Sequence, residues 1–492
     1  MNILLVYPKI PSTFWSFESA LNFIAKKSAE PPLGLITVAS MLPKEWNLKL
    51  IDMNVAELLD KDIVWADFVF LSGMSVQIHS FKEVIRRCNI LSTKIVAGGP
   101  LATTQYKDFL GVDHFVLNEA EITLPQFLQD LEFGIPKSIY STTEFPEITN
   151  IPIPRWDLLD IKKYASMSMQ YSRGCPYDCE FCSITMLNGR KPRTKTKDQF
   201  LNELNHLYNM GYRGPISVVD DNFIGNKIKL KKEILPALIE WSKQRKYPFS
   251  FITEVSINLA DDEELSEMLA EAGFNSLFIG IETPNSSSLE ECGKDQNLRR
   301  DLVESVQKLQ SKGFMVSGGF IVGFDSDPES IFDEQIEFIK QSGIASAMVG
   351  LLNAPTGTKL HARMKTENRL LDSWSGNNVD GSINFIPKMN YSELMRGYTK
   401  ILKTIYADKE YYLRVKKFLT IYKMPEWGIK FPSFSELQTF FRLLWRLGFL
   451  DKGKLYFWKL LFFSLINYPK KFVIAMTFAV YGYHFREIVK TI

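Results

Sequence analysis

Over the first 130 residues, short apolar runs alternate with segments whose apolar residues recur at helical spacing. The segments 34–43 and 80–91 place their apolar residues on one helical face. Alternation of strand and helix predicts a doubly wound parallel sheet, an α/β fold. The expected strands are residues 2–8, 48–54, 68–75, 94–100 and 114–121.

A second alternation starts at residue 166. Six apolar runs are separated by amphipathic segments such as "DEELSEMLAEAG". Six successive strand–helix units predict a partial (β/α)6 parallel barrel, whose chemistry is expected at the C-terminal ends of its strands. The expected strands are residues 166–174, 216–222, 249–256, 276–282, 314–324 and 345–352.

The domain boundaries follow from these patterns. Residues 1–135 form the first α/β unit, a proline-rich connector spans 136–165, the barrel spans 166–365, and a mostly helical region spans 366–492. Within 455–485 there are two apolar stretches of about a dozen residues each, shorter than a membrane span. Two readings stay open: a helical cap packed over the barrel, or a lipid-facing surface with Tyr456, Trp458 and Lys459 at headgroup level.

Composition narrows the functional class. The 492 residues are 46% hydrophobic and 23% charged, with a formal net charge of +2. This balance argues against a dedicated nucleic-acid binder, which would carry a basic surplus. Five cysteines indicate a reducing compartment, and the first residues lack the features of a signal peptide. We expect a cytoplasmic protein, with peripheral contact at the inner face of the membrane as the alternative.

Three of the five cysteines stand together as C-x3-C-x2-C in "RGCPYDCEFCS". A structural zinc site needs a fourth ligand, and a disulfide leaves one thiol over. An iron–sulfur cluster with three protein ligands and one open iron fits the spacing better. A zinc site that borrows a histidine or Cys292 is the remaining alternative. The candidate cluster ligands are Cys175, Cys179 and Cys182.

The predicted strand ends carry acids and glycines. In the first unit these are "SGMSVQ" (72–77), "AGGP" (97–100) and "NEAE" (118–121), where small residues let a flat ligand approach the backbone. No G-x-G-x-x-G follows the first strand, which argues against a dinucleotide. The barrel acids could instead only cap helices. The barrel residues concerned are Asp220, Asp221, Glu254, Glu282, Gly318, Gly319 and Gly323.

The cysteine motif, with the aromatic Phe181 before its third cysteine, resembles the radical S-adenosylmethionine (SAM) superfamily. The resemblance implies a 4Fe-4S cluster whose open iron chelates SAM, and a 5′-deoxyadenosyl radical that abstracts hydrogen from an unactivated carbon. "GIE" (280–282) and "GGFIVGF" (318–324) look like ribose-binding and adenine-binding strands, whereas "VVDDNF" (218–223) replaces the usual Gly-Gly-Glu stretch. The implied SAM contacts are Phe181, Asp220, Glu254, Glu282, Gly319, Ile321 and Gly323.

The first unit resembles the corrinoid domain of the subfamily that joins cobalamin binding to this barrel. "YPKIPSTFW", "PPLGLITVASMLP", "GGP" and "NEAE" carry the likeness. The D-x-H-x-x-G motif is absent, so the lower face of cobalamin is expected to meet the 72–79 loop without histidine coordination. The implied cobalamin contacts are Ser72, Gly73, Ser75, Gln77, Gly98, Gly99 and Glu119.

Within this subfamily, residues 1 to about 410 resemble the hopanoid C-methylase group, through motifs such as "VDDNFIGNK" and "LEECGKDQN". The resemblance implies a cobalamin-dependent radical SAM C-methyltransferase that transfers the methyl group of methylcobalamin to an unactivated carbon. The expected substrate is a small, apolar, hopanoid-like lipid, and flavodoxin or ferredoxin is the expected electron donor. Two rivals remain: a cyclase or rearrangement enzyme of the same architecture, and a non-catalytic corrinoid or iron–sulfur carrier or sensor.

Overall fold

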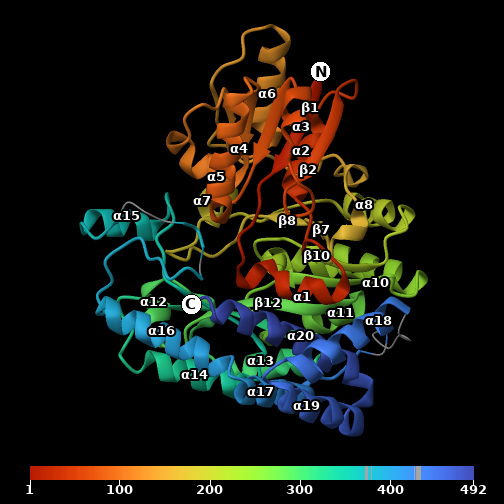
Figure 1. Cartoon of the computed structure of the whole chain (residues 1–492), viewed down its shortest axis with the longest axis vertical. Helices are drawn as coiled ribbons and strands as arrows, with labels where there is room; N and C mark the ends of the chain where they lie inside the picture. The colour runs from red at the N-terminus through yellow and green to blue at the C-terminus, as the bar shows by residue number, and fades with distance from the viewer. Residues whose placement is uncertain (372–374, 378, 426, 428–433) are drawn as a thin grey trace.

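The computed structural model describes every residue except 372–374, 378, 426 and 428–433. Two parallel sheets lie one above the other along the long axis of the molecule, and helices of the C-terminal region wrap the lower one (Figure 1). Each sheet has six strands. Among the described helices, none is both long and apolar enough to cross a membrane.

The N-terminal sheet has the strand order β2-β1-β3-β4-β5-β6, and every neighbouring pair is parallel. Helices cover both faces: α2 and α6 bury one hydrophobic cluster and α4 and α5 another. The doubly wound α/β prediction is confirmed. Its elements are β1 Asn2–Tyr7, α2 Leu33–Met41, β2 Asn47–Asp52, α3 Asp60–Trp65, β3 Phe68–Ser72, α4 Ile78–Ile90, β4 Lys94–Gly98, α5 Gly99–Gln105, β5 His114–Val116, α6 Ala120–Glu132 and β6 Ile139–Tyr140.

The sixth strand, β6, lies inside the stretch that the sequence predicts as a connector. It pairs with β5 through Phe115 and Ile139. The proline-rich residues that follow then lead to the second sheet.

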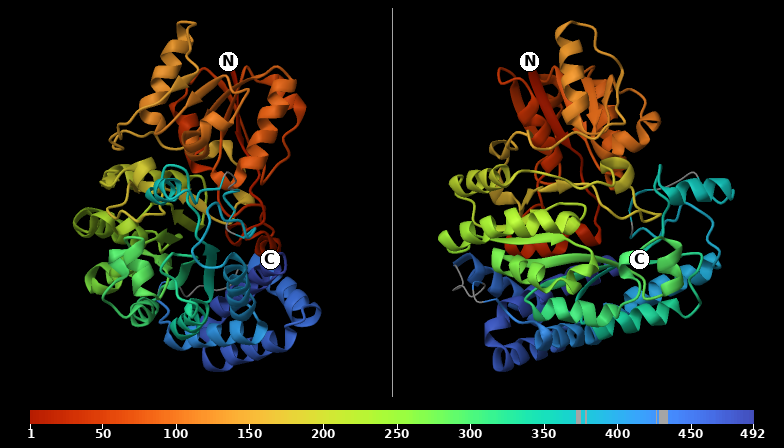
Figure 2. Two further views of the ribbon diagram at one scale, coloured as in Figure 1. Left: turned by 90° about the vertical axis from the view of Figure 1, so that its left-hand side faces the viewer. Right: turned by 180° about the vertical axis from the view of Figure 1, so that it is seen from behind.

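The barrel sheet has the order β14-β13-β12-β11-β10-β7, all parallel, with helices on its outer side (Figure 2). The partial (β/α)6 barrel is also confirmed. Its elements are β7 Met167–Met169, α8 Lys197–Asn209, β10 Gly214–Val218, α10 Leu235–Gln244, β11 Phe249–Glu254, α11 Glu263–Ala272, β12 Phe274–Glu282, α12 Ser286–Glu291, α13 Leu302–Ser311, β13 Met315–Val322, α14 Ile331–Ser342 and β14 Ser346–Leu351.

Two segments far apart in the sequence fill the open side of the barrel between β14 and β7. Residues 8–32 leave the N-terminal sheet, form the short helix α1 Glu18–Leu21, and run in extended form beside the chain that enters β7. Helix α20, Phe472–Val489, packs against α1 and β14. Phe14 and Phe485 pack with ring centroids 5.8 Å apart, and Phe17 and Tyr481 lie 5.1 Å apart.

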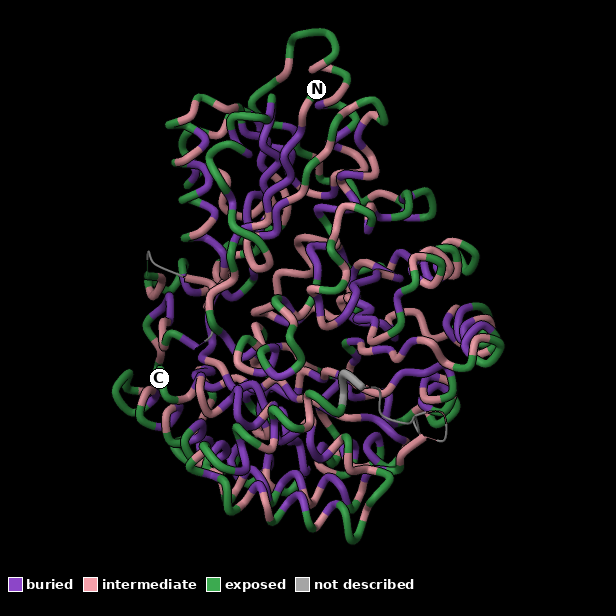
Figure 3. Tube along the Cα trace, turned by 45° about the vertical axis from the view of Figure 1, so that its right-hand side comes forward, coloured by how far each residue is buried: buried purple, intermediate pink, exposed green. Residues whose placement is uncertain are grey.

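The other C-terminal helices extend this packing. α16 lies on α14, and α17 contacts α19 and α20. Their inner faces are buried together with the barrel, whereas their outer turns are exposed (Figure 3). These helices are α15 Lys359–Thr366, α16 Tyr391–Ile405, α17 Asp408–Ile421, α18 Phe434–Leu443 and α19 Lys454–Asn467.

Candidate functional site

A cavity of about 2260 Å³ lies between the C-terminal ends of the two sheets and continues into the barrel. Its walls come from the strand-end loops of the N-terminal sheet, from β7 and β10–β14, from residues 8–38, and from α18 and α20. Small-molecule sites commonly occupy about 300–1,000 Å³. The cavity is therefore large enough to hold more than one ligand.

The three cysteines of the motif lie beside this cavity, on the loop that connects β8 Ser172–Arg173 to its antiparallel partner β9 Arg193–Thr194. Gly174 has φ of 95°, and a Cβ there would lie 2.9 Å from the carbonyl oxygen of Asn188. Asp221, at the end of β10, accepts a hydrogen bond from Gly174 N at 2.8 Å and another from the Asn188 side chain. The end of β10 thus anchors the start of the cysteine loop.

The three thiols lie close enough to influence one another electrostatically. Burial raises the pKa of Cys182 to about 12 and also raises those of Cys175 and Cys179. Among the described residues, no three His, Cys, Asp or Glu side chains converge on the position of a single metal ion. A cubane cluster binds each thiolate through a different iron, so it does not need that convergence. Three thiols on one loop fit such a cluster.

A buried ion pair lies next to the cysteine loop. Lys294 Nζ donates to Glu282 Oε1 at 2.6 Å. Burial alone would lower the pKa of Lys294, but the neighbouring Glu282 and Cys179 raise it above its ordinary value. Glu282 itself has φ of 63°, in the left-handed region, at a register shift between β12 and β13. A non-glycine residue held there is a strained position of the kind found at functional sites.

Sequence reasoning predicted Glu282 but missed Lys294. The lysine stands in the turn after α12, and only the fold brings it to the end of β12. Gly280 makes the pair possible, because a Cβ at this position would collide with the carboxylate of Glu282 and lie 2.8 Å from Lys294 Nζ.

The other predicted SAM residues divide into two groups. Phe181, Glu254, Gly319 and Ile321 line the cavity together with Glu282. Asp220 and Gly323 do not. Asp220 accepts hydrogen bonds from the backbone N–H groups of Tyr171 and Ser172, both at 2.7 Å, and burial raises its pKa to about 7. Gly323 N donates to Asp327 at 2.8 Å. Both residues lie behind the cavity wall and stabilise the backbone of the loops that form it.

The predicted cobalamin residues lie at the edge of the N-terminal sheet. A Cβ at Gly98 would lie 2.7 Å from the carbonyl oxygen of Val116. Gly99 has φ of 80° and lies beside Ser72. Together with Gly73 they leave a stretch of edge without large side chains, which fits a broad, flat ligand. Of the predicted contacts, those on the cavity are Ser72, Gly73, Ser75, Gly98, Gly99 and Glu119.

Two of the predicted contacts have structural partners. Gln77 is buried behind the wall, donates to Pro8 O and accepts from Met74 N, so it holds the 72–77 loop in place. Glu119 accepts from both Arg173 and Arg193 and thereby links the N-terminal domain to the β8–β9 strand pair that flanks the cysteine loop. No histidine lies among the described residues that line the cavity.

Comparison with known proteins agrees with this architecture. Residues 24–128 match the B12 binding domain, residues 169–339 the radical SAM superfamily, and residues 358–492 a domain of unknown function. The chain is 40% identical to an uncharacterized methyltransferase of Synechocystis over 100% of its own length and 93% of that protein. It is 35% identical to the hopanoid C-2 methylase of Rhodopseudomonas palustris over 77% of the chain and 73% of that enzyme.

Solved structures share the fold. The cobalamin-dependent SAM radical enzyme OxsB, with aqua-cobalamin and SAM bound, superposes with a TM-score of 0.64 at 15% identity, over 99% of this chain and 79% of that one. The radical SAM methyltransferase TsrM from Kitasatospora setae, with cobalamin and a [4Fe-4S] cluster bound, gives a TM-score of 0.58 at 13% identity, over 81% and 85% of the two chains.

Proposed function

The chain belongs to the cobalamin-binding radical SAM enzyme family, and on that premise we propose that it methylates an unactivated carbon of an apolar, lipid-like small molecule. It is a cobalamin-dependent radical SAM methyltransferase that uses a 4Fe-4S cluster, SAM and cobalamin. The substrate class is the proposed part.

The cavity carries this proposal. The cavity is bounded on one side by the strand-end loops of the N-terminal sheet, where we propose that cobalamin binds, and on the other side by the cysteine loop. A substrate inside it would therefore reach both. Beyond the barrel most of its wall is formed by apolar side chains of the C-terminal helices, with Thr439, Lys470 and Thr477 as polar exceptions, and this favours a largely apolar substrate. The relative named hopanoid C-2 methylase supports a lipid of this kind. The helical residues concerned are Leu437, Phe440, Leu443, Phe472, Met476 and Val480.

The residues present fit the three cofactors. We propose that Cys175, Cys179 and Cys182 hold the cluster, with the Glu282–Lys294 pair beside it. When bound, the cluster and SAM supply one-electron cleavage chemistry, and cobalamin supplies the methyl group. The chain contributes binding and the exclusion of water. The proposed contacts are Phe181, Glu282, Gly319 and Ile321 for SAM, and Ser72, Gly73, Ser75, Gly98 and Gly99 for cobalamin.

Growth with methyl-labelled methionine tests this function. Lipid extracts of a strain that carries the gene and of its deletion strain are compared by mass spectrometry. We expect an apolar product that is heavier by one labelled methyl group and disappears with the gene. A product that has lost hydrogen without gaining a methyl group would favour the cyclase, and 5′-deoxyadenosine without any lipid change would exclude the lipid substrate.

We propose in addition that the C-terminal helices touch a membrane. Trp445, Phe449, Trp458 and Phe462 form a continuous aromatic row, with successive ring centroids 5.9, 6.0 and 5.9 Å apart. Trp445, Phe449 and Phe462 are exposed. An apolar patch of this kind on a soluble fold marks an interaction surface. Basic residues along the same segment favour an anionic lipid surface: Arg442, Arg446, Lys452, Lys454, Lys459, Lys470 and Lys471.

The helical segment that carries Trp445 and Phe449 follows directly after α18, which lines the cavity. Leu437 on α18 and Val473 on α20 line the cavity, yet they are 44% and 59% exposed. An apolar substrate could therefore pass from a membrane into the cavity beside them.

We also propose that a flavodoxin or a ferredoxin is the electron donor. In an assay, dithionite can reduce the cluster in place of this protein.

A further inference from the structure

Two carboxyl groups on the cavity wall, those of Glu30 and Glu254, form no ion pair with a described residue and make few hydrogen bonds to the protein. The other carboxylates on the cavity wall are engaged: Glu18 by Ser12, Glu119 and Glu121 by arginine, Asp221 by the cysteine loop, and Glu282 by lysine. Glu30 accepts a long hydrogen bond from Ser168 Oγ at 3.4 Å and also lies near the hydroxyl group of Ser217. Glu254 accepts none from the described residues.

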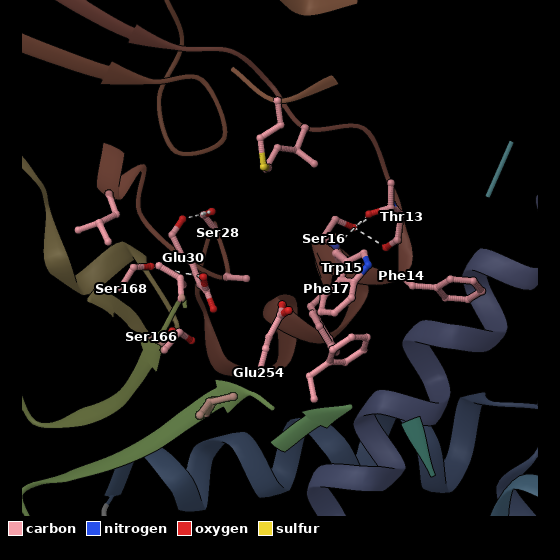
Figure 4. A pocket seen from close by; sticks show the side chains of 18 of the residues that line it. Thr13, Phe14, Trp15, Ser16, Phe17, Ser28, Glu30, Ser166, Ser168 and Glu254 are labelled. Atoms are coloured by element: carbon pink, nitrogen blue, oxygen red, sulfur yellow. Dashed lines mark hydrogen bonds between the residues drawn. The ribbon is translucent and has the colours of Figure 1, made fainter. Parts of the chain in front are cut away.

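Both carboxyl groups point into the same space (Figure 4). Glu254 stands at the end of β11, and Glu30 comes from the extended segment beside β7. Burial, then the nearby Asp221 and Glu30, raise the pKa of Glu254 to about 7. Burial also raises the pKa of Glu30. Near neutral pH the carboxyl group of Glu254 can therefore both donate and accept hydrogen bonds.

The walls around these groups differ in character. On the side of Glu30, three serines gather: Ser28, Ser166 and Ser168. Across the space stands Trp15, 48% exposed toward the cavity, with its ring 4.8 Å from that of Phe278 (Figure 4). The match to the B12 binding domain begins at residue 24, so the segment that carries Trp15 lies outside that domain model.

We propose that Glu30, Glu254 and the face of Trp15 bind the polar end of the substrate, a hydroxyl or amino group on an otherwise apolar molecule. This inference rests on the proposed function, because it concerns the same cavity. Both side chains are accessible from the cavity, and without an ion pair their oxygens are free to accept a hydrogen bond from a ligand. An ammonium group would gain a further contact over the indole ring. The apolar body of the substrate then extends toward α18 and α20.

Calorimetric binding of three probes to the holoenzyme tests the assignment: octylamine, octanol and octyl methyl ether. The ether has the same apolar chain but no donor. We expect the wild type to prefer the amine or the alcohol over the ether, and the preferred member of the first two identifies the head group. Glu30→Gln and Glu254→Gln should each reduce this preference about tenfold. Glu329→Gln, at an exposed position, is the matched control.

SAM affinity and 5′-deoxyadenosine formation are measured on the same samples. A variant that loses SAM affinity while it keeps the head-group preference would assign its carboxyl group to the cofactor and overturn the proposal. Equal binding of all three probes to the wild type would overturn it too. Absence of SAM cleavage or corrinoid uptake in the wild type would instead count against the enzymatic function. Trp15→Ala should weaken octylamine more than octanol if an ammonium group is bound.

Discussion

Arg193 Nη2 donates a hydrogen bond to Glu119 Oε1 at 2.6 Å, and the two side chains are only 6% and 7% exposed. Arg173 donates to the other carboxylate oxygen at 2.7 Å. Glu119 belongs to the N-terminal sheet, whereas Arg173 stands two residues before Cys175. The pairing therefore fixes the edge of the corrinoid domain against the proposed cluster loop.

Removal of this carboxylate should be costly, because it leaves the buried guanidinium group of Arg193 without an anionic partner, whereas Arg173 keeps Glu121. We expect Glu119→Ala to lower the free energy of unfolding by about 3–5 kcal/mol, as for other broken buried ion pairs. Urea denaturation followed by circular dichroism measures the change. Glu83→Ala removes the exposed pair with Arg86 and should have a much smaller effect. Equal, small losses in the two variants would show that the link between the N-terminal domain and the cysteine loop carries little energy.

The cluster assignment predicts a clear division among the five cysteines. Cys175→Ala, Cys179→Ala and Cys182→Ala should each abolish cluster retention and 5′-deoxyadenosine formation after anaerobic reconstitution. Cys88→Ala and Cys292→Ala should keep about four irons and four sulfides per chain. Cys292 is buried, and burial raises the pKa of its thiol well above the ordinary value, so it is a poor ligand. Tightly bound zinc in place of iron would contradict the assignment.

The barrel strands could be predicted because their signal is local. The apolar run 314–324 contains β13, and the run 345–352 contains β14. Each strand is long enough, and apolar enough, for its pattern to be recognised without knowledge of its neighbours. The cysteine loop is also local, since its three thiols lie within eight residues.

The features that sequence reasoning missed depend on long-range contacts. Residues 8–32 have the composition of a loop, and their position at the barrel is set by packing such as that of Phe14 on Phe485. Lys294 meets Glu282 only because the turn after α12 folds back over β12. The partners of Glu119 and Asp220 are likewise invisible in a linear pattern, which shows a carboxylate but not the groups that donate to it.

The space at Gly280 gives a direct test of the Glu282–Lys294 pair. A methyl group at this position would collide with both partners, so Gly280→Ala should displace them and weaken SAM binding at least about tenfold if the pair supports the cofactor. Equilibrium dialysis with labelled SAM measures this. Gly134→Ala, where φ is 74° but no atom lies within 4 Å, should cost about 1 kcal/mol of stability and leave SAM binding unchanged. Unchanged binding in Gly280→Ala would separate the pair from the cofactor site.

Glu254 predicts a pH dependence of stability. Its pKa is about 7 in the folded protein against 4.5 for an ordinary glutamate, because burial and the nearby Asp221 and Glu30 outweigh the attraction of Lys294. The folded state therefore holds the proton more tightly than the unfolded state, and its contribution to stability is lost as the pH rises from about 4.5 to about 7.

Glu254→Gln should flatten this part of the profile and raise the melting temperature relative to the wild type above about pH 7. Thermal unfolding across this pH range measures the difference. Glu329→Gln should follow the wild-type profile, because this position is exposed and lies outside the cavity. Parallel profiles for the wild type and Glu254→Gln would mean that water in the cavity keeps this carboxyl group ionised.

The membrane contact predicts a loss of binding that depends on both apolar and basic side chains. Co-sedimentation with phosphatidylglycerol–phosphatidylcholine vesicles should fall at least about tenfold in Trp445→Ala/Phe449→Ala, since each ring removes apolar area from the interface. Phe133→Ala removes an exposed ring from the other end of the molecule and should bind like the wild type. Neutral vesicles or added salt should weaken binding, because the basic residues then lose their attraction to anionic lipid. If the double variant instead converts a dimer to a monomer without a change in vesicle binding, the aromatic row is a contact between two copies of the chain.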